Sequence, residues 1–362
     1  FTDAFISLKD EKTLKELSAK VDLMAAPKPI QAKKEKEIFE TNSGAKVIFY
    51  PVPDTGVVSV RAGFLGGVRA ENTQKIGSFE LLSKLWPAGT ELKNEAQISD
   101  ILETKSSSIA AFAGRNSFGL QMHALNSVEQ DVGELFKEIL LKPTFPQKEF
   151  DREKEILKRQ IENLVDHPSS LVFSDFMKSM FGDHPYAHET HGTVETIANI
   201  QTQDLQKLYK KYVCGSNMTF VVAGGIDTQF WRDQIEQITA SLPNGSRFEQ
   251  KFNHESISSP QKTYRALNKE QSHIVYGFRG LSIYDKEKYA LQVMQTMLSG
   301  QGGRLFMELR DKASLAYSVS PVRMDGIETG YFGGYIGCSP EKGKKAIEMM
   351  KIEFDRLASE KA

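Results

Sequence analysis

Three closely spaced histidines are the residues whose side chains best suit metal chemistry. His184, His188 and His191 follow one another at intervals of four and three residues, and imidazole is the commonest metal ligand in proteins. Pro185 and the neighbouring glycines favour a loop, in which helical spacing does not fix the geometry of the rings. We therefore expect no metal site there. No ligand spacing is present at the remaining histidines, His123, His167, His254 and His273.

A glycine-rich segment raises the question of phosphate binding. Ser299-Gly-Gln-Gly-Gly-Arg304 lacks the lysine and the Ser/Thr of a P-loop, and no strand precedes it. Phosphate binding is therefore not expected. The simplest interpretation of Gly300, Gly302 and Gly303 is a turn that joins two helices.

The stretch from Lys75 to Thr90 carries an acid and a base at helical spacing. Glu80 and Lys84 are four residues apart, with the acid on the N-terminal side, which is the favourable order for an ion pair on a helix. Such a pair stabilises a helix by about 0.2 to 0.5 kcal/mol. The residues alone therefore predict a helix with a salt bridge on its surface.

The same stretch resembles the zinc-binding helix of the pitrilysin, insulysin and mitochondrial processing peptidase family of inverted-zincin metallopeptidases. Active members carry a segment like G-L-A-H-L-L-E-H-M-L-F-K-G-T, whose H-x-x-E-H motif supplies two zinc ligands and a general base. The framework of that segment is present here as Gly77, Leu81, Leu82, Gly89 and Thr90. Its chemistry is absent, because Glu80, Ser83 and Lys84 stand where the family has histidine, glutamate and histidine.

The third zinc ligand of the family is a glutamate about seventy-six residues further on. The matching segment, Asp151 to Ile161, has Gln160 at that place. The resemblance thus implies a member, or one half of a member, that lacks the zinc motif and holds no cofactor of its own. Weak metal binding by Glu80 and Gln160 is the competing interpretation, but a lysine ammonium cannot ligate and an amide is a poor zinc ligand.

The resemblance extends from about residue 37 to 358. Further matching segments follow in the family's order and spacing: 166–170, 180–186, 192–193, 209–212, 217–224 and 303–318. In the last segment the family carries an arginine and a tyrosine that reach into the zinc site of a homologous half, and Arg310 and Tyr317 match them. The resemblance implies that these two residues bind the transition state or the substrate in a partner's site. The alternative is a surface arginine and a tyrosine in the core of a strand.

The family also has a flexible loop near its peptide chamber at the position of Gly300, Gly302 and Gly303. The resemblance thus offers a substrate-loop role for these glycines beside the simple turn. A zinc-bearing homologous half or subunit is the implied partner, with zinc held in that half, and a peptide or unfolded polypeptide is the implied substrate.

Length and composition agree with an ordinary globular protein. The 362 residues exceed the size at which a single core stops growing, about 250 to 300 residues, so two domains are expected. A net charge of −1 does not favour nucleic acid as a partner, and no apolar run reaches the roughly 20 residues of a membrane span. We expect a soluble protein, of the bacterial periplasm or cytoplasm without preference. Cys214 and Cys338 are expected to be buried free thiols.

The predicted fold class is α+β, with two homologous two-layer domains. Each domain is expected to be a mainly antiparallel sheet covered by helices, and Gly63-Phe-Leu-Gly66 and Gly277-Phe-Arg-Gly280 suggest that the domains are degenerate copies. The predicted organisation is a helix near 11–24 and a linker in residues 1–36, a first domain at 37–243 and a second at 244–362. The second domain is expected to be truncated at its C-terminus.

The first domain is predicted to begin with a hairpin at 37–50. Its helices are expected near 73–86, 95–105, 127–140, 147–165, 170–180 and 203–211. Its other strands are expected at 57–64, 109–113, 117–124 and 219–223. In the second domain we expect strands at 273–278, 315–322 and 330–337, and helices near 285–298, 303–312 and after 340.

The sequence supports two hypotheses of function. In the first, the chain is the non-zinc-binding half or subunit of a zinc metalloendopeptidase, inactive alone, which donates Arg310 and Tyr317 to a zinc-bearing half and helps to enclose peptides. That half is expected in the same polypeptide, with a separate heterodimer subunit as the alternative. In the second, the chain is a non-catalytic scaffold or peptide-binding module of the same fold.

Overall fold

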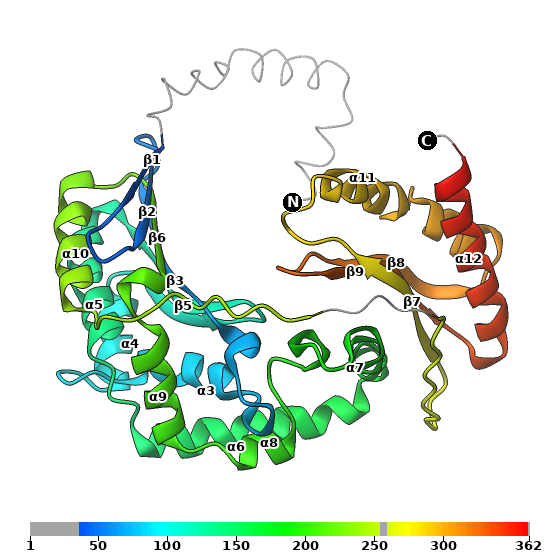
Figure 1. Cartoon of the computed structure of the whole chain (residues 1–362), viewed down its shortest axis with the longest axis horizontal. Helices are drawn as coiled ribbons and strands as arrows, with labels where there is room; N and C mark the ends of the chain where they lie inside the picture. The colour runs from blue at the N-terminus through cyan, green and yellow to red at the C-terminus, as the bar shows by residue number, and fades with distance from the viewer. Residues whose placement is uncertain (1–35, 254–258, 361–362) are drawn as a thin grey trace, which may run out of the picture.

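A computed structural model describes residues 36–253 and 259–360 of the chain. Within them, two β-sheets with their own covering helices lie at opposite ends of the molecule (Figure 1). The helix predicted near 11–24 lies outside the described residues. None of the described helices is long and apolar enough to cross a bilayer.

The first sheet has six strands in the order β1-β2-β6-β3-β5-β4. Its strands are β1 (Glu37–Glu40), β2 (Lys46–Pro51), β3 (Val57–Leu65), β4 (Ser108–Ala113), β5 (Ser117–Leu125) and β6 (Met218–Gly224). All neighbouring strands are antiparallel except β2 and β6, which pair in parallel. Alternate residues of β3, such as Val58, Val60 and Ala62, are buried, because successive side chains of a strand point to opposite faces.

Helices cover the buried face of the first sheet. They are α3 (Ser78–Leu85), α4 (Glu95–Thr104), α5 (Glu129–Leu141), α6 (Gln147–Asn163), α8 (Val194–Ala198), α9 (Thr202–Tyr212) and α10 (Thr228–Ser241). Both tryptophans, Trp86 and Trp231, are fully buried between these helices and the sheet. Helix α3 packs against α6 and α9, so it is held at the centre of this layer.

The second sheet is smaller and wholly antiparallel. Its strands β7 (Ser272–Gly280), β9 (Gly330–Cys338) and β8 (Ala316–Met324) lie in that order. Helix α11 (Lys288–Leu298), a π-helical segment at Phe306–Lys312 and α12 (Gly343–Ser359) complete this part. Met350 and Phe354 of α12 pack with Phe332 and Ile336 of β9 in one core cluster.

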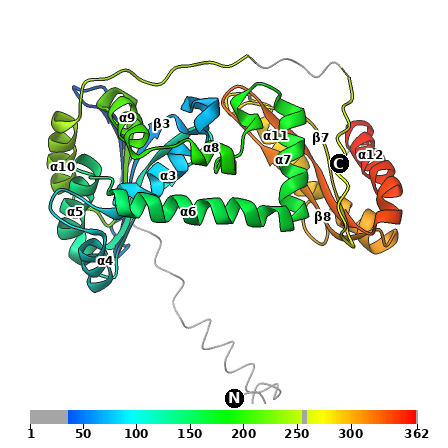
Figure 2. The ribbon, with the colours of Figure 1, turned by 90° about the horizontal axis from the view of Figure 1, so that it is seen from below.

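Helix α7 (Pro168–Phe181) joins the two parts of the molecule. It follows α6 but packs against β7 of the second sheet, and Figure 2 shows it on the side of that sheet opposite α12. Phe176 meets Tyr331 edge to face at 5.2 Å between ring centroids. A Cβ at Gly277 would lie 2.8 Å from the Phe176 ring, so a larger residue there would displace that ring.

The α+β class and the helix-covered, mainly antiparallel sheets are confirmed. The hairpin at 37–50 forms with its predicted turn. Cys214 and Cys338 are buried free thiols. The sequence did not predict α10 or the short α8, and it gave no sign that α7, predicted as part of the first domain, would cover the second sheet.

Candidate functional site

Helix α3 begins at a position that only glycine can occupy easily. Gly77 has φ of +101°, and a Cβ there would lie 2.4 Å from Ile197 and 2.8 Å from the carbonyl oxygen of His191. The carboxylate of Glu71 accepts hydrogen bonds from the backbone N–H groups of Gly77 at 3.0 Å and Phe79 at 2.6 Å. These bonds satisfy donors that a helix N-terminus leaves free.

Burial and the nearby carboxylate of Glu80 act against the ionised form of Glu71. Burial, as the largest cause, raises the pKa of Glu71 to about 7, although backbone hydrogen bonds from Phe79, Gly77 and Ser78 oppose the shift. The carboxyl group of Glu71, at the start of α3, therefore binds and releases its proton near neutral pH.

The four positions that the resemblance assigns to a zinc site do not fit a zinc ion. Lys84 Nζ lies 3.5 Å from Glu80 Oε1, so the predicted ion pair is present, and Ser83 Oγ donates to the Glu80 carbonyl oxygen at 2.7 Å. Gln160 is exposed on α6. Across 36–253 and 259–360, no three His, Cys, Asp or Glu side chains gather in a way that could hold a metal.

Arg310, near the end of a helical segment, and Tyr317, near the start of a strand, are both exposed. Arg310 lies in the π-helical segment 306–312, and its guanidinium carbon is 4.5 Å from the centre of the Phe306 ring. Tyr317, on β8, is 65% exposed. It therefore does not fill the core of its strand, which was the alternative that the sequence left open.

The glycines between α11 and the next helix have backbone reasons for being there. Gly300 has φ of +74°, and its carbonyl oxygen accepts from Gly303 N at 3.1 Å. A Cβ at Gly303 would lie 2.3 Å from the Ser299 carbonyl oxygen, whereas Gly302 has open space around it. These contacts are those of a tight turn between helices.

The three histidines do not form a cluster with one role. His184 is buried, accepts a hydrogen bond from Tyr186 N at 3.1 Å and lies 3.6 Å from Glu328. His188 and His191 line a large cavity together with residues of α6 and α7.

A buried polar network connects the two parts of the molecule. Arg69 forms an ion pair with Glu328 of the turn between β8 and β9, and also donates to the Gln250 carbonyl oxygen at 2.9 Å. The Tyr186 hydroxyl donates to Asn116 at 2.5 Å and accepts from Ile327 N at 2.8 Å. Because breaking a buried ion pair leaves an uncompensated charge, this network resists separation of the two parts.

The cavity between α6, α7, α8 and β9 has a volume of about 930 Å³. Its walls come from segments far apart in the sequence, including Ile76, Ile161, Ser170, Lys178 and Tyr335. The positions Glu80, Ser83, Lys84 and Gln160 are not part of the lining, although Ile161 is the neighbour of Gln160. No motif marked this cavity, since its residues converge only through tertiary packing.

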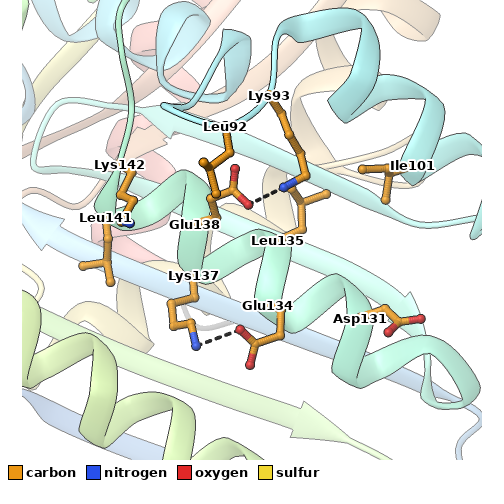
Figure 3. Close-up of a pocket in the computed structure, with 10 residues that line it drawn as sticks. All are labelled: Leu92, Lys93, Ile101, Asp131, Glu134, Leu135, Lys137, Glu138, Leu141 and Lys142. Atoms are coloured by element: carbon orange, nitrogen blue, oxygen red, sulfur yellow. Dashed lines mark hydrogen bonds and ion pairs between the residues drawn. The ribbon is translucent and has the colours of Figure 1, made fainter.

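A smaller depression of about 320 Å³ lies over α4 and α5 (Figure 3). Its charged side chains neutralise one another, with Lys93 2.5 Å from Glu138 and Lys137 2.7 Å from Glu134. Its size and its paired charges are those of a solvated helix surface, and we assign no function to it.

Two family models match successive parts of this chain. The model described as insulinase (peptidase family M16) matches residues 49–194, and the model described as peptidase M16 inactive domain matches residues 199–362.

Relatives and solved structures agree with these matches. The chain is 24% identical to a Rickettsia bellii protein named "Uncharacterized zinc protease" over 335 residues, which cover 91% of this chain and 79% of the relative. It is also 24% identical to a Bacillus subtilis protein named "Uncharacterized zinc protease YmxG", covering 86% of this chain and 76% of the relative. The crystal structure of a peptidase M16 inactive domain from Pseudomonas fluorescens superposes with a TM-score of 0.84 at 21% identity, over 91% of this chain and 80% of that one.

Proposed function

We propose that this chain, which belongs to the insulinase family of peptidases, family M16, is the non-zinc-binding half or subunit of a zinc metalloendopeptidase. The observation that carries the proposal is a contrast between two sites. On helix α3, Glu80 and Lys84 form an ion pair at positions where the resemblance places zinc ligands, whereas Arg310 and Tyr317 are exposed and available to another chain or domain.

The chemistry of Arg310 and Tyr317 suits a donor role in amide hydrolysis. Attack on a peptide carbonyl places negative charge on its oxygen, and fixed donors stabilise that charge. A guanidinium supplies a permanent cation and a phenol supplies a neutral hydroxyl. In the proposed assembly a zinc-bearing homologous half supplies the metal and the base, and the two halves together enclose the peptide.

The test is to assemble the chain with a zinc-bearing homologous partner and to replace each donor. Arg310→Ala and Tyr317→Phe should each lower kcat/KM for a quenched peptide by about 10²- to 10³-fold while leaving the assembly intact by size-exclusion chromatography. Arg247→Ala and Tyr264→Phe are matched controls, because both side chains are exposed. Unchanged turnover in both donor variants would refute the proposal and favour a scaffold or peptide-binding module.

A further inference from the structure

The 930 Å³ cavity has an apolar wall built from two helices and a strand. Ile161 of α6 and Leu164, just after the end of that helix, face the cavity together with Leu171 and Phe173 of α7. The Phe173 ring stacks on Tyr335 of β9 at 5.8 Å between centroids, which closes this wall on the side of the second sheet. A pocket of this size accommodates a drug-sized ligand or the end of a peptide.

Most charged groups of the cavity are already paired. Arg265 makes a two-bond pair with Asp175, at 2.7 and 2.9 Å. Glu189 is paired with Arg115 at 3.2 Å. These two pairs contribute no net charge.

Lys178 also lines the cavity, and its positive charge takes no part in these two ion pairs. Among the described residues it makes no ion pair, and it lies on α7 two turns beyond Leu171. The hydroxyl side chains of Ser170 and Ser174 line the same cavity and can donate hydrogen bonds. The cavity thus joins one unpaired positive charge and neutral donors to an apolar wall.

His188 adds a group whose charge can respond to a ligand. Burial, followed by the positive charges of Lys178 and Arg115, lowers the pKa of His188. A bound anion would offset those positive charges and raise the pKa again. The other ionisable side chains on the cavity lining are Lys178, Glu189, His191, Arg265 and Tyr335. Glu189 is paired with Arg115 and Arg265 with Asp175, whereas Lys178 makes no ion pair within the part of the chain that the structure describes.

We propose that this cavity binds a carboxylate carried on an apolar chain, with Lys178 as its counterion, and that the carboxylate is the C-terminus of an apolar peptide. The carboxylate chemistry follows from the cavity alone. The choice of a peptide over a fatty acid rests on the proposed function, because a peptidase assembly releases new C-termini.

The experiment compares three probes by isothermal titration calorimetry on the full chain: N-acetyl-Leu-Leu-Leu with a free C-terminus, the same peptide as the amide, and decanoate. We expect the peptide acid to bind at least about tenfold more tightly than the amide, since a charge-assisted hydrogen bond distinguishes them. Lys178→Met should remove that preference. Lys344→Met, at an exposed lysine of α12 that makes no ion pair with any described residue, should leave it unchanged.

The pH dependence gives a second readout. Affinity for the peptide acid should increase as the pH falls from 8 to 6, because anion binding favours protonated His188, and His188→Gln should flatten this dependence. Thermal melting checks that each variant is folded. Equal affinity for acid and amide, or full affinity in Lys178→Met, would overturn the proposal.

Two further outcomes separate this proposal from the proposed function. Binding of decanoate without the peptide acid would support the carboxylate site and reject the peptide as its source. Arg310→Ala should bind the peptide acid normally, because Arg310 does not line the cavity. The chain could show no turnover with a zinc-bearing partner and still bind the peptide acid more tightly than the amide. That result would refute the proposed function and support the carboxylate site.

Discussion

Helix α3 and the segment from Gly303 to Ser318 differ in what they keep. Helix α3 keeps the residues that pack it in place, whereas the second segment keeps side chains that could act on a substrate. In α3 the framework is kept, since Gly77 allows the close approach at its start and Leu81 and Leu82 are fully buried. Its outward residues, Glu80 and Lys84, pair with each other. In the second segment the residues that could act on a substrate, Arg310 and Tyr317, are exposed and make no ion pair within the described chain.

This difference shows which properties of a site survive when its chemistry is lost. Packing of α3 against α6 and α9 serves the core of the first sheet whether or not a metal is bound. Deleting one of its buried leucines would cost about 2 to 5 kcal/mol. The ligand positions point away from that core, so they can change without loss of the fold.

The largest effect should come from restoring ligands on the retained framework of α3 and α6. In a triple variant, Glu80→His, Lys84→His and Gln160→Glu, we expect near-stoichiometric zinc after dialysis, because residues four apart lie on one face of a helix and α6 packs beside α3. Metal analysis measures this, with circular dichroism as a check on folding.

The matched control for the triple variant is Glu80→His with Lys84→His alone. It offers two ligands where a structural or catalytic zinc site needs at least three, so it should lose zinc on dialysis. A folded triple variant that binds no zinc would contradict the view that the framework is intact, and the contrast between the two regions would disappear.

A smaller effect should follow from changing Glu71, which holds the start of α3. Its pKa of about 7 in the folded state lies above the ordinary glutamate pKa of 4.5, so the folded chain binds the proton more tightly than the unfolded chain. The contribution of Glu71 to the free energy of unfolding is therefore greatest below pH 4.5 and falls as the pH rises through 7. The fall should be up to about 3 kcal/mol.

Glu71→Gln should remove this part of the pH dependence. Urea unfolding at several pH values between 4 and 8 measures it, and the wild type minus variant difference isolates Glu71 from other titrating groups. Glu103→Gln, at an exposed residue of α4, is the control. A variant with the wild-type pH profile would show that the N-terminus of α3 is not held by a protonatable group.

The sequence was sufficient where local pattern and framework residues determine structure. The i, i+4 spacing predicted the Glu80–Lys84 pair, and strands predicted at 57–64 and 117–124 are present as β3 and β5. It failed at α10, where Trp231, Ile235 and Ile238 are buried against the first sheet. Trp231, Ile235 and Ile238 stand four and three residues apart, a spacing that is typical of one face of a helix.

The other features that the sequence did not predict depend on contacts between segments that are far apart in the chain. The parallel pairing of β2 with β6 joins strands more than 160 residues apart, and α7 covers a sheet that begins about 90 residues after the helix ends. The cavity combines Ile76, Lys178 and Tyr335, which share no motif. Such sites depend on packing between distant segments, which one sequence does not specify by spacing.

The smallest expected effect concerns the ion pair that replaces the ligands. Lys84 is about half exposed and its nitrogen is 3.5 Å from Glu80, so a double-mutant cycle of Glu80→Gln and Lys84→Met should give a coupling of only about 0.2 to 0.5 kcal/mol, decreasing with salt. Urea unfolding at low and high ionic strength measures it, with Glu308 and Lys312, another i, i+4 pair, as the reference cycle. A coupling above about 2 kcal/mol would mean that the pair locks α3 in place, and the surface of this helix would then be part of its framework. A small coupling would mean that the stability of α3 comes from its buried face, which is the reason the site could lose its chemistry and keep its shape.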